Sequence, residues 1–143
     1  MLYRFWTEDP SCIVGAFWDH MPSASVRDFH QALRAHQQMP ATQRSCLGYV
    51  KADTVVSRRA LSAIGDFLSD PEIDMDAWVC CIAGTGFWAA TGRGMASSVM
   101  LVTSTRAPVK ITSTVSESMR WLSERGHPTP TSNIEEALAE VSF

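Results

Sequence analysis

The stretch Ala77-Trp78-Val79-Cys80-Cys81-Ile82-Ala83 decides how this chain folds. Its apolar side chains follow one another without alternation, which is typical of a strand that is covered on both faces of a sheet. After it come a glycine break at Gly84-Thr85-Gly86, a helix over residues 87–103 and a second strand at residues 109–113. This succession predicts a strand–helix–strand unit of the α/β class.

The residues before this unit predict a hairpin and a first helix. Strands are expected at residues 2–7 and 12–18, and the turn-forming residues 8–11 between them favour antiparallel pairing. A break at residues 19–22 ends the hairpin. Ser25 is the expected N-cap of the helix. The buried face of this helix follows at helical spacing, at Val26, Phe29, Leu33 and His36.

A third strand is predicted at residues 46–52, and a second helix follows it. Either Asp53 or Thr54 is expected to cap this helix, and Pro71 ends it because proline cannot continue the helical hydrogen bonds. Its apolar side chains recur with the period of a helix, at Val56, Ala60, Leu61, Ile64, Phe67 and Leu68.

The last third of the chain carries clear helix signals. Thr114 and Glu117 form a capping box that opens a helix, and Gly126 is a plausible stop at its end. A final segment, capped by Ser132, places apolar side chains on one stripe that can dock on its own domain or on a partner. These side chains are Ile134, Ala137, Leu138 and Val141.

The expected order of elements is therefore β-β-α-β-α-β-α-β-α-α. Alternation of strands and helices predicts one mixed, mostly parallel five-stranded sheet with an N-terminal hairpin, covering helices and right-handed crossovers. We expect one α/β domain at residues 1–126 and a helical extension at residues 127–143 that packs on the domain or on a partner.

Composition and charge argue against several classes of protein. The 143 residues fit one domain, and 45% apolar with 19% charged residues is ordinary globular composition. A net charge of −3 without a concentrated basic face argues against nucleic-acid binding. The longest uncharged stretch, residues 77–92, is shorter than the ~20 residues that a bilayer requires, so no membrane span is expected. The N-terminus lacks the apolar core of a signal peptide.

The cysteines and histidines do not predict a catalytic or metal site. The four cysteines contain no C-x-x-C pair, which favours buried thiols in a reducing compartment and a cytoplasmic location. Distance along the chain leaves a Cys–His pair open, but buried thiols such as Cys80 and Cys81 resist ionisation. The four histidines share no ligand spacing, and the acidic residues of 70–76 lack the glycine of an EF-hand loop and are interpreted as a solvated turn. We expect no catalysis and no metal.

The break before the third predicted helix is the candidate ligand site. Residues 84–89 match the G-x-G-x-x-A dinucleotide fingerprint, but the strand is the fourth, two bulky aromatic residues crowd the phosphate approach and no acid follows for a ribose. A tight turn explains the glycines equally well, so no cofactor is expected. The unpaired N–H groups of the helix start can still contact an anion, and the aromatic pair can line an apolar pocket. The candidate residues are Gly84, Thr85, Gly86, Phe87, Trp88 and Arg93, the last projecting two turns along the helix.

Residues 106–111, running into residues 114–122, resemble the SpoIIAA-like branch of the STAS superfamily (sulphate transporter and anti-sigma-factor antagonist domains). Members often end with a similar Pro-Val/basic strand and a capped helix that closes on a Trp-Leu pair, here Trp121-Leu122. The order of elements over residues 1–126 is also similar to STAS. The resemblance implies a STAS/SpoIIAA-like fold and a non-catalytic regulatory or protein-interaction domain with a protein partner, which can be a second copy of the chain.

In phospho-switched STAS proteins a serine within an Asp-Ser-Ser-Gly-like motif opens the helix after the third strand. Ser57 is the nearest match here, with Arg58 and Arg59 in place of the second serine and the glycine. The resemblance therefore implies Ser57 as the phospho-switch. A hypothesis of another class is a carrier or binder of a small apolar or anionic ligand at the strand–helix corner of residues 84–88.

Overall fold

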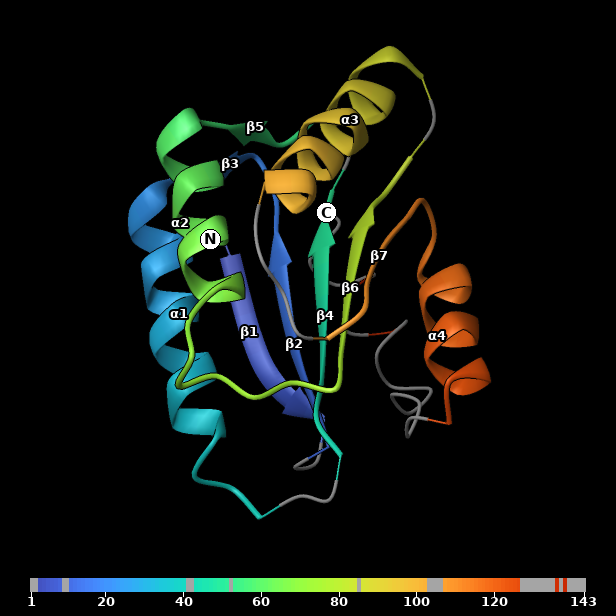
Figure 1. Ribbon diagram of the computed structural model, residues 1–143. Coiled ribbons are helices and arrows are strands. Elements are labelled where there is room, and N and C mark those ends of the chain that lie inside the picture. The colour runs from blue at the N-terminus through green and yellow to red at the C-terminus, as the bar shows by residue number, and fades with distance from the viewer. Residues whose placement is uncertain are drawn as a thin grey trace.

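The computed structural model describes residues 3–8, 11–40, 43–51, 53–84, 86–102 and 107–126, together with Glu136 and Leu138. Its main sheet has five strands in the order β1-β2-β4-β6-β7 (Figure 1). β1 runs antiparallel to β2, and the other neighbours are parallel. The strands are β1 (Tyr3–Glu8), β2 (Cys12–Phe17), β4 (Ser45–Val50), β6 (Ala77–Ile82) and β7 (Val109–Thr112). The α/β class, the mostly parallel sheet and the N-terminal hairpin are confirmed.

Three helices connect the parallel strands, and a fourth follows the last strand. They are α1 (Ser23–His36), α2 (Arg58–Leu68), α3 (Phe87–Val102) and α4 (Val115–Glu124). Each connection leads to the next strand in the same direction across the sheet, so right-handed crossovers place α1, α2 and α3 on one face. α4 covers the opposite face (Figure 1). The molecule therefore has three layers, with helices on both sides of one sheet.

The strand β6 lies inside the sheet, between β4 and β7, as its continuous apolar sequence predicts. Trp78 and Ile82 belong to the core cluster on the α1–α2 face, whereas Val79 and Cys81 belong to the cluster on the α4 face. Because successive side chains point to opposite faces, a strand with two covered faces needs apolar residues at every position.

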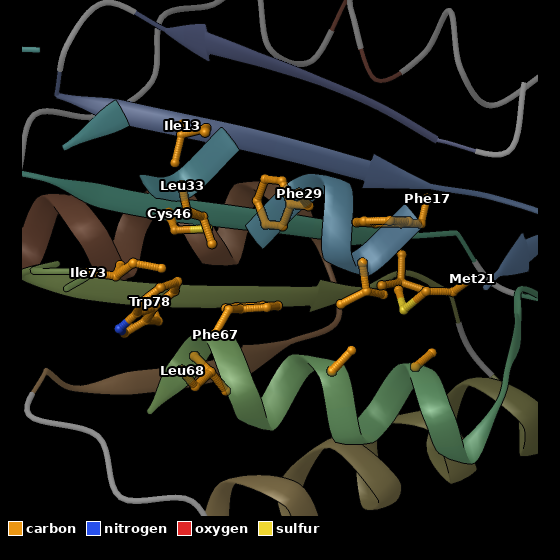
Figure 2. Close-up of a cluster of buried hydrophobic side chains, with 14 of the residues drawn as sticks. Ile13, Phe17, Met21, Phe29, Leu33, Cys46, Phe67, Leu68, Ile73 and Trp78 are labelled. Carbon is orange, nitrogen blue, oxygen red and sulfur yellow. The ribbon is translucent and has the colours of Figure 1, made fainter. Parts of the chain in front are cut away.

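The core on the α1–α2 face is built around aromatic side chains. Phe29 of α1 and Phe67 of α2 extend toward the strands and meet edge to face, with their ring centroids 5.8 Å apart (Figure 2). Phe67 also lies 5.7 Å from the ring of Trp78. Such pairs contribute ~0.5–1.5 kcal/mol beyond the area that they bury. They fix the positions of α1 and α2 over the sheet.

A second, two-stranded sheet replaces loops that the sequence predicted, so the expectation of a single sheet is wrong. β3 (His20–Met21) pairs in parallel with β5 (Val55–Val56). β3 falls in the expected break at residues 19–22, and β5 occupies the start of the expected second helix. Each strand has two residues, which is too short for a periodic sequence signal.

The second sheet also moves the start of α2. Its N-cap is Ser57, whose Oγ accepts a hydrogen bond from the backbone N–H of Ala60 at 3.1 Å. Asp53 instead lies in a turn with a φ of 70°, and the Thr54 hydroxyl donates to the carbonyl of Lys51 at 2.7 Å. Neither residue caps the helix, because the chain first forms β5.

The start of α1 differs from the prediction as well. The helix begins at Ser23 after Pro22, and the backbone N–H groups of Ser25 and Val26 donate to the Pro22 carbonyl. Ser25 is therefore a buried residue of the first turn and not the N-cap. The predicted buried face of α1 is confirmed for Val26, Phe29, Leu33 and His36.

The predicted helix signals of α4 are confirmed. The backbone N–H of Glu117 donates to Thr114 Oγ1 at 3.1 Å, while the Glu117 carboxylate accepts from the N–H of Ser113 at 3.4 Å. Gly126 follows the C-cap residue with a φ of 75°. Of the predicted C-terminal stripe, Leu138 is 3% exposed and packs in the α4-face core. Ser132, Ile134, Ala137 and Val141 lie outside the described residues.

Candidate ligand-binding site

A chamber of about 460 Å³ lies between α2 and α3, beyond the carboxyl ends of β4 and β6. The crevice at the carboxyl edge of parallel strands is where open α/β sheets commonly bind ligands. The small sheet of β3 and β5 and the loop after β4 complete its wall. The two helices line it with Leu61, Ile64, Ala89, Gly92, Met95 and Ala96.

The chamber exists because α3 turns small residues toward α2. Ala89, Gly92 and Ala96 are three and four positions apart, so they lie on one face of the helix. A Cβ at Gly92 would lie 3.4 Å from the Ile82 side chain, so α3 sits close to β6 at this point. The small side chains let α3 approach the sheet but leave the space toward α2 unfilled.

A second cavity, the recess, lies deeper, between the sheet and α1–α2. Its volume is about 70 Å³, and its walls are apolar side chains, including those of Phe29, Phe67 and Trp78. The recess and the chamber share four wall residues, so the recess lies directly beneath the chamber. The shared residues are Met21, Val50, Ile64 and Cys80.

The recess is a consequence of small residues in one row of the sheet. Gly15, Gly48 and Cys80 are in register on neighbouring strands. At Gly15 the space is filled by the Phe29 ring, which a Cβ would meet at 2.8 Å. At Gly48 the space is open, since the nearest heavy atom to a Cβ would be the Val79 carbonyl oxygen at 3.8 Å.

The thiol of Cys80 borders both cavities and is uncharged. Burial raises the pKa of Cys80 to about 12, and the neighbouring Cys81 thiol adds to the shift. Burial also raises the pKa of Cys46, which lines the recess. Because the thiolate is the reactive form of cysteine, the raised pKa values favour uncharged, apolar wall groups at these positions.

The rim of the chamber combines polar groups with exposed apolar side chains. Lys51, Asp53 and Thr54 come from the loop after β4. Val55 is 60% exposed and Met95 is 38% exposed, and both line the chamber. The mouth of the chamber therefore presents apolar surface to water beside a group of polar side chains.

The predicted strand–helix corner lies next to the chamber but does not line it in the described residues. Gly84 and Gly86 have φ angles of 101° and 99°, which agrees with a tight turn. Thr85 and the side chains of Phe87 and Trp88 lie outside the described residues.

Arg93 is placed differently from the prediction. Its Nη1 donates to the carbonyls of Ile82 at 3.0 Å and Gly84 at 3.1 Å, so the side chain folds back over the corner and braces it. The guanidinium thus donates to one carbonyl at the end of β6 and to one in the turn that follows it. Arg93 therefore does not project along α3.

Ser57 is exposed at the beginning of α2. The residues directly before it, Val55 and Val56, line the chamber, whereas its own Oγ caps the helix. The sequence-based interpretation missed this grouping of β5 and α3 side chains. The one local feature that could have indicated it is the set of small residues on one face of α3, Ala89, Gly92 and Ala96.

The acidic loop after α2 is solvent-exposed at Glu72, Asp74 and Asp76, as predicted, but Asp70 is not solvated and ties the loop to α1. Asp70 Oδ2 accepts hydrogen bonds from His30 Nε2 at 2.6 Å and Arg34 Nε at 2.8 Å, and its side chain is 5% exposed. Burial alone would raise the pKa of Asp70, but the hydrogen bonds from His30, the Glu72 amide and Arg34, with the Arg34 charge, outweigh burial and lower the pKa to about 2. This polar tie holds the outer edge of the α1–α2 layer.

Within the described part of the chain, no helix is both long and apolar enough to cross a bilayer. Over the same ranges, no cluster of three or more His, Cys, Asp or Glu side chains could hold a metal ion.

Comparisons with protein-family models, curated proteins and solved structures find no match to this chain. The geometry of the chamber is therefore the main support for a function.

Proposed function

We propose that this protein binds a small apolar molecule in the chamber between α2 and α3, without catalysis. The observation that carries the proposal is the chamber itself, whose volume of about 460 Å³ lies within the range of ~300–1,000 Å³ typical of small-molecule sites. Its walls are mostly apolar, and a few polar groups lie at the rim, which is the usual composition of such sites.

Two further features support this function. Val55 and Met95 expose apolar surface at the mouth, and surface of this kind marks places where a ligand or partner binds. The Cys80 thiol is uncharged at neutral pH, so the inner wall offers an apolar ligand no charge to desolvate.

The test is to fill the chamber from α3 and measure binding of an apolar fluorescent dye. Ala96→Leu places a larger side chain in the chamber and is expected to abolish saturable dye binding. Ala90→Leu is the matched control, because Ala90 is an exposed residue of α3 that does not line the chamber. Equal dye binding by the two variants, or no saturable binding by the wild type, would contradict the proposal.

A second proposal is that the chain is a STAS/SpoIIAA-like regulatory or protein-interaction domain that Ser57 switches. The supporting observation is the position of Ser57, exposed at the N-cap of α2 and followed by Arg58 and Arg59. A phosphate at a helix N-terminus is stabilised by the unpaired N–H groups and by nearby cations. The protein partner in this proposal can be a second copy of the chain.

Phosphosite mapping by mass spectrometry on the protein recovered from its native cells tests the switch. Phosphate on Ser57 is expected, with Ser62, an exposed serine farther along α2, as the control position. Ser57→Asp is then expected to gain or lose a partner or a second copy of the chain. Light scattering measures this as a change in the molecular mass of the complex. An unmodified Ser57 together with an unchanged mass would reject the switch.

A further inference from the structure

We infer that the ligand is a single-chain amphiphile of the fatty-acid type, whose chain end enters the recess, and that Gly48 sets the length of chain the protein accepts. This inference rests on the proposed binding function and adds the shape of the ligand. It joins three observations: the narrow recess below the chamber, the polar rim above it, and a glycine that the fold does not otherwise require.

The size of the recess favours a chain over a ring. An apolar cavity of ~150 Å³ in a protein core is known to hold one benzene molecule. The recess measures about 70 Å³, so it is too small for an aromatic ring but accepts the end of an aliphatic chain. The wider chamber above it holds the remainder of the ligand.

The polarity of the two cavities also differs, as a ligand with one apolar end and one polar end requires. The recess is lined by apolar side chains, whereas the chamber also has Lys51, Asp53 and Thr54 at its rim. A polar group placed in the recess would lose its water without gaining a hydrogen bond. The ligand therefore lies with its polar head at the rim and its methyl end in the recess.

Met21 and Ile64 stand at the boundary between the two cavities, together with Cys80 and Val50. Methionine has an unbranched, flexible side chain that adapts to irregular spaces. Met21 lies at the end of the two-residue strand β3, on the small sheet that also forms the chamber wall. Met21 can therefore adapt to a chain end that passes from the chamber into the recess.

Gly48 is the residue whose identity the fold leaves unexplained. Its φ lies outside the left-handed region, and a Cβ there would meet no heavy atom closer than 3.8 Å. A glycine inside a strand costs stability, since it has no side chain to pack. Gly15, one strand away, is required by the Phe29 ring, whereas Gly48 serves to keep the recess empty.

The experiment measures dissociation constants for straight-chain fatty acids from octanoate to palmitate by calorimetry. In the wild type, affinity is expected to rise about fourfold with each methylene group until the chain end reaches the end of the recess. Gly48→Val fills the recess and is expected to weaken the longest tightly bound acid about tenfold, while octanoate is unchanged. Cys80→Ala enlarges the recess, so the affinity is expected to keep rising to longer chains before it levels off.

An ω-hydroxy fatty acid tests directly whether the chain end is buried. The wild type is expected to bind it about tenfold more weakly than the plain acid of the same length, because the buried hydroxyl has no partner. Gly48→Val is expected to remove this difference. Tyr49→Phe, on the other face of the same strand, is the control that should change neither result.

The outcomes separate this inference from the binding function itself. If Gly48→Val binds every chain length as the wild type does and the ω-hydroxyl is tolerated, the recess is not used and the inference is overturned. If no fatty acid binds although the dye binds and Ala96→Leu abolishes its binding, the ligand class is wrong and the chamber function stands. If Gly48→Val does not fold, Gly48→Ala adds the smallest side chain that narrows the recess and carries the same prediction with a smaller loss.

Discussion

The two faces of the sheet are packed to different extents, although the same strands contribute to both. On the α4 face, Val14, Leu47, Cys81 and Leu122 are fully buried and belong to one hydrophobic cluster. On the other face, which α1, α2 and α3 cover (the α1–α3 face), the same strands border the recess and the chamber. The comparison shows that alternate residues of one strand can seal one side of a protein and leave space on the other.

The difference begins with side-chain size at neighbouring positions. β4 gives Leu47 and Tyr49 to the α4 face, but Cys46, Gly48 and Val50 to the other. Two buried polar side chains of the α4 face pair with each other, since Thr112 Oγ1 and Ser118 Oγ lie 2.5 Å apart. The described side chains of the α4 face are therefore closely packed, whereas the α1–α3 face contains a void that costs stability and offers a site.

The largest effect is expected from a cavity cut into the filled face. Leu122→Ala should lower the free energy of unfolding by about 2–5 kcal/mol, because the surrounding side chains cannot move in to fill the space. Ile64→Ala, beside the existing cavities, should cost only about 1–2 kcal/mol, since Ile64 is partly exposed and already contacts empty space. Urea denaturation of both variants measures the difference. Equal losses would mean that the two faces are equally well packed.

An intermediate effect is expected at the two glycines of one row. Gly15→Ala should destabilise the protein by about 1–3 kcal/mol, since its Cβ would lie 2.8 Å from the Phe29 ring. Gly48→Ala should stabilise it by roughly 0.5–1 kcal/mol, because the new methyl group enters open space in a strand. The melting temperature should therefore fall for Gly15→Ala and rise for Gly48→Ala, although the substitution is the same. A lower melting temperature for both would show that the space over Gly48 is closed in solution.

The sequence predicted the filled parts of the molecule better than the open ones. The continuous apolar run of β6 identified an interior strand, and Thr114 with Glu117 identified the start of α4. Both signals are local, because burial on two faces and helix capping depend on the residues of one segment.

The chamber had no comparable signal. The chamber arises where Ala89 and Ala96 of α3 face α2, and the recess beneath it arises at Gly48. Small residues predict close packing when a neighbour fills the space, as Phe29 does at Gly15, and a cavity when none does. Which of the two occurs depends on the helix that lies opposite, and this is a property of the fold and not of the segment. The fold of Arg93 over the corner was missed for the same reason.

The smallest effect is expected at the polar tie that holds the outer edge of the α1–α2 layer. Asp70→Asn removes the ion pair with Arg34 and weakens the hydrogen bond with His30, and the loss should be about 1 kcal/mol because Arg34 is half exposed to water. The sign of the pH dependence follows from the pKa of Asp70, which is lowered to about 2 in the folded protein. A carboxyl whose pKa is lower when folded stabilises the protein above its unfolded value near 4, and the contribution is lost as the pH falls toward 2.

Wild type and Asp70→Asn are therefore expected to differ at pH 6 and to converge in stability as the pH falls through about 2, because Asp70 then becomes protonated in the folded state as well as in the unfolded state. Leu122→Ala is the control for this pH scan, since no ionisable group changes and its deficit should stay constant. A difference between wild type and Asp70→Asn that persists undiminished at low pH would mean that the carboxylate charge does not hold α1 to the loop after α2. The edge of the α1–α3 face would then depend on apolar packing, as the α4 face does.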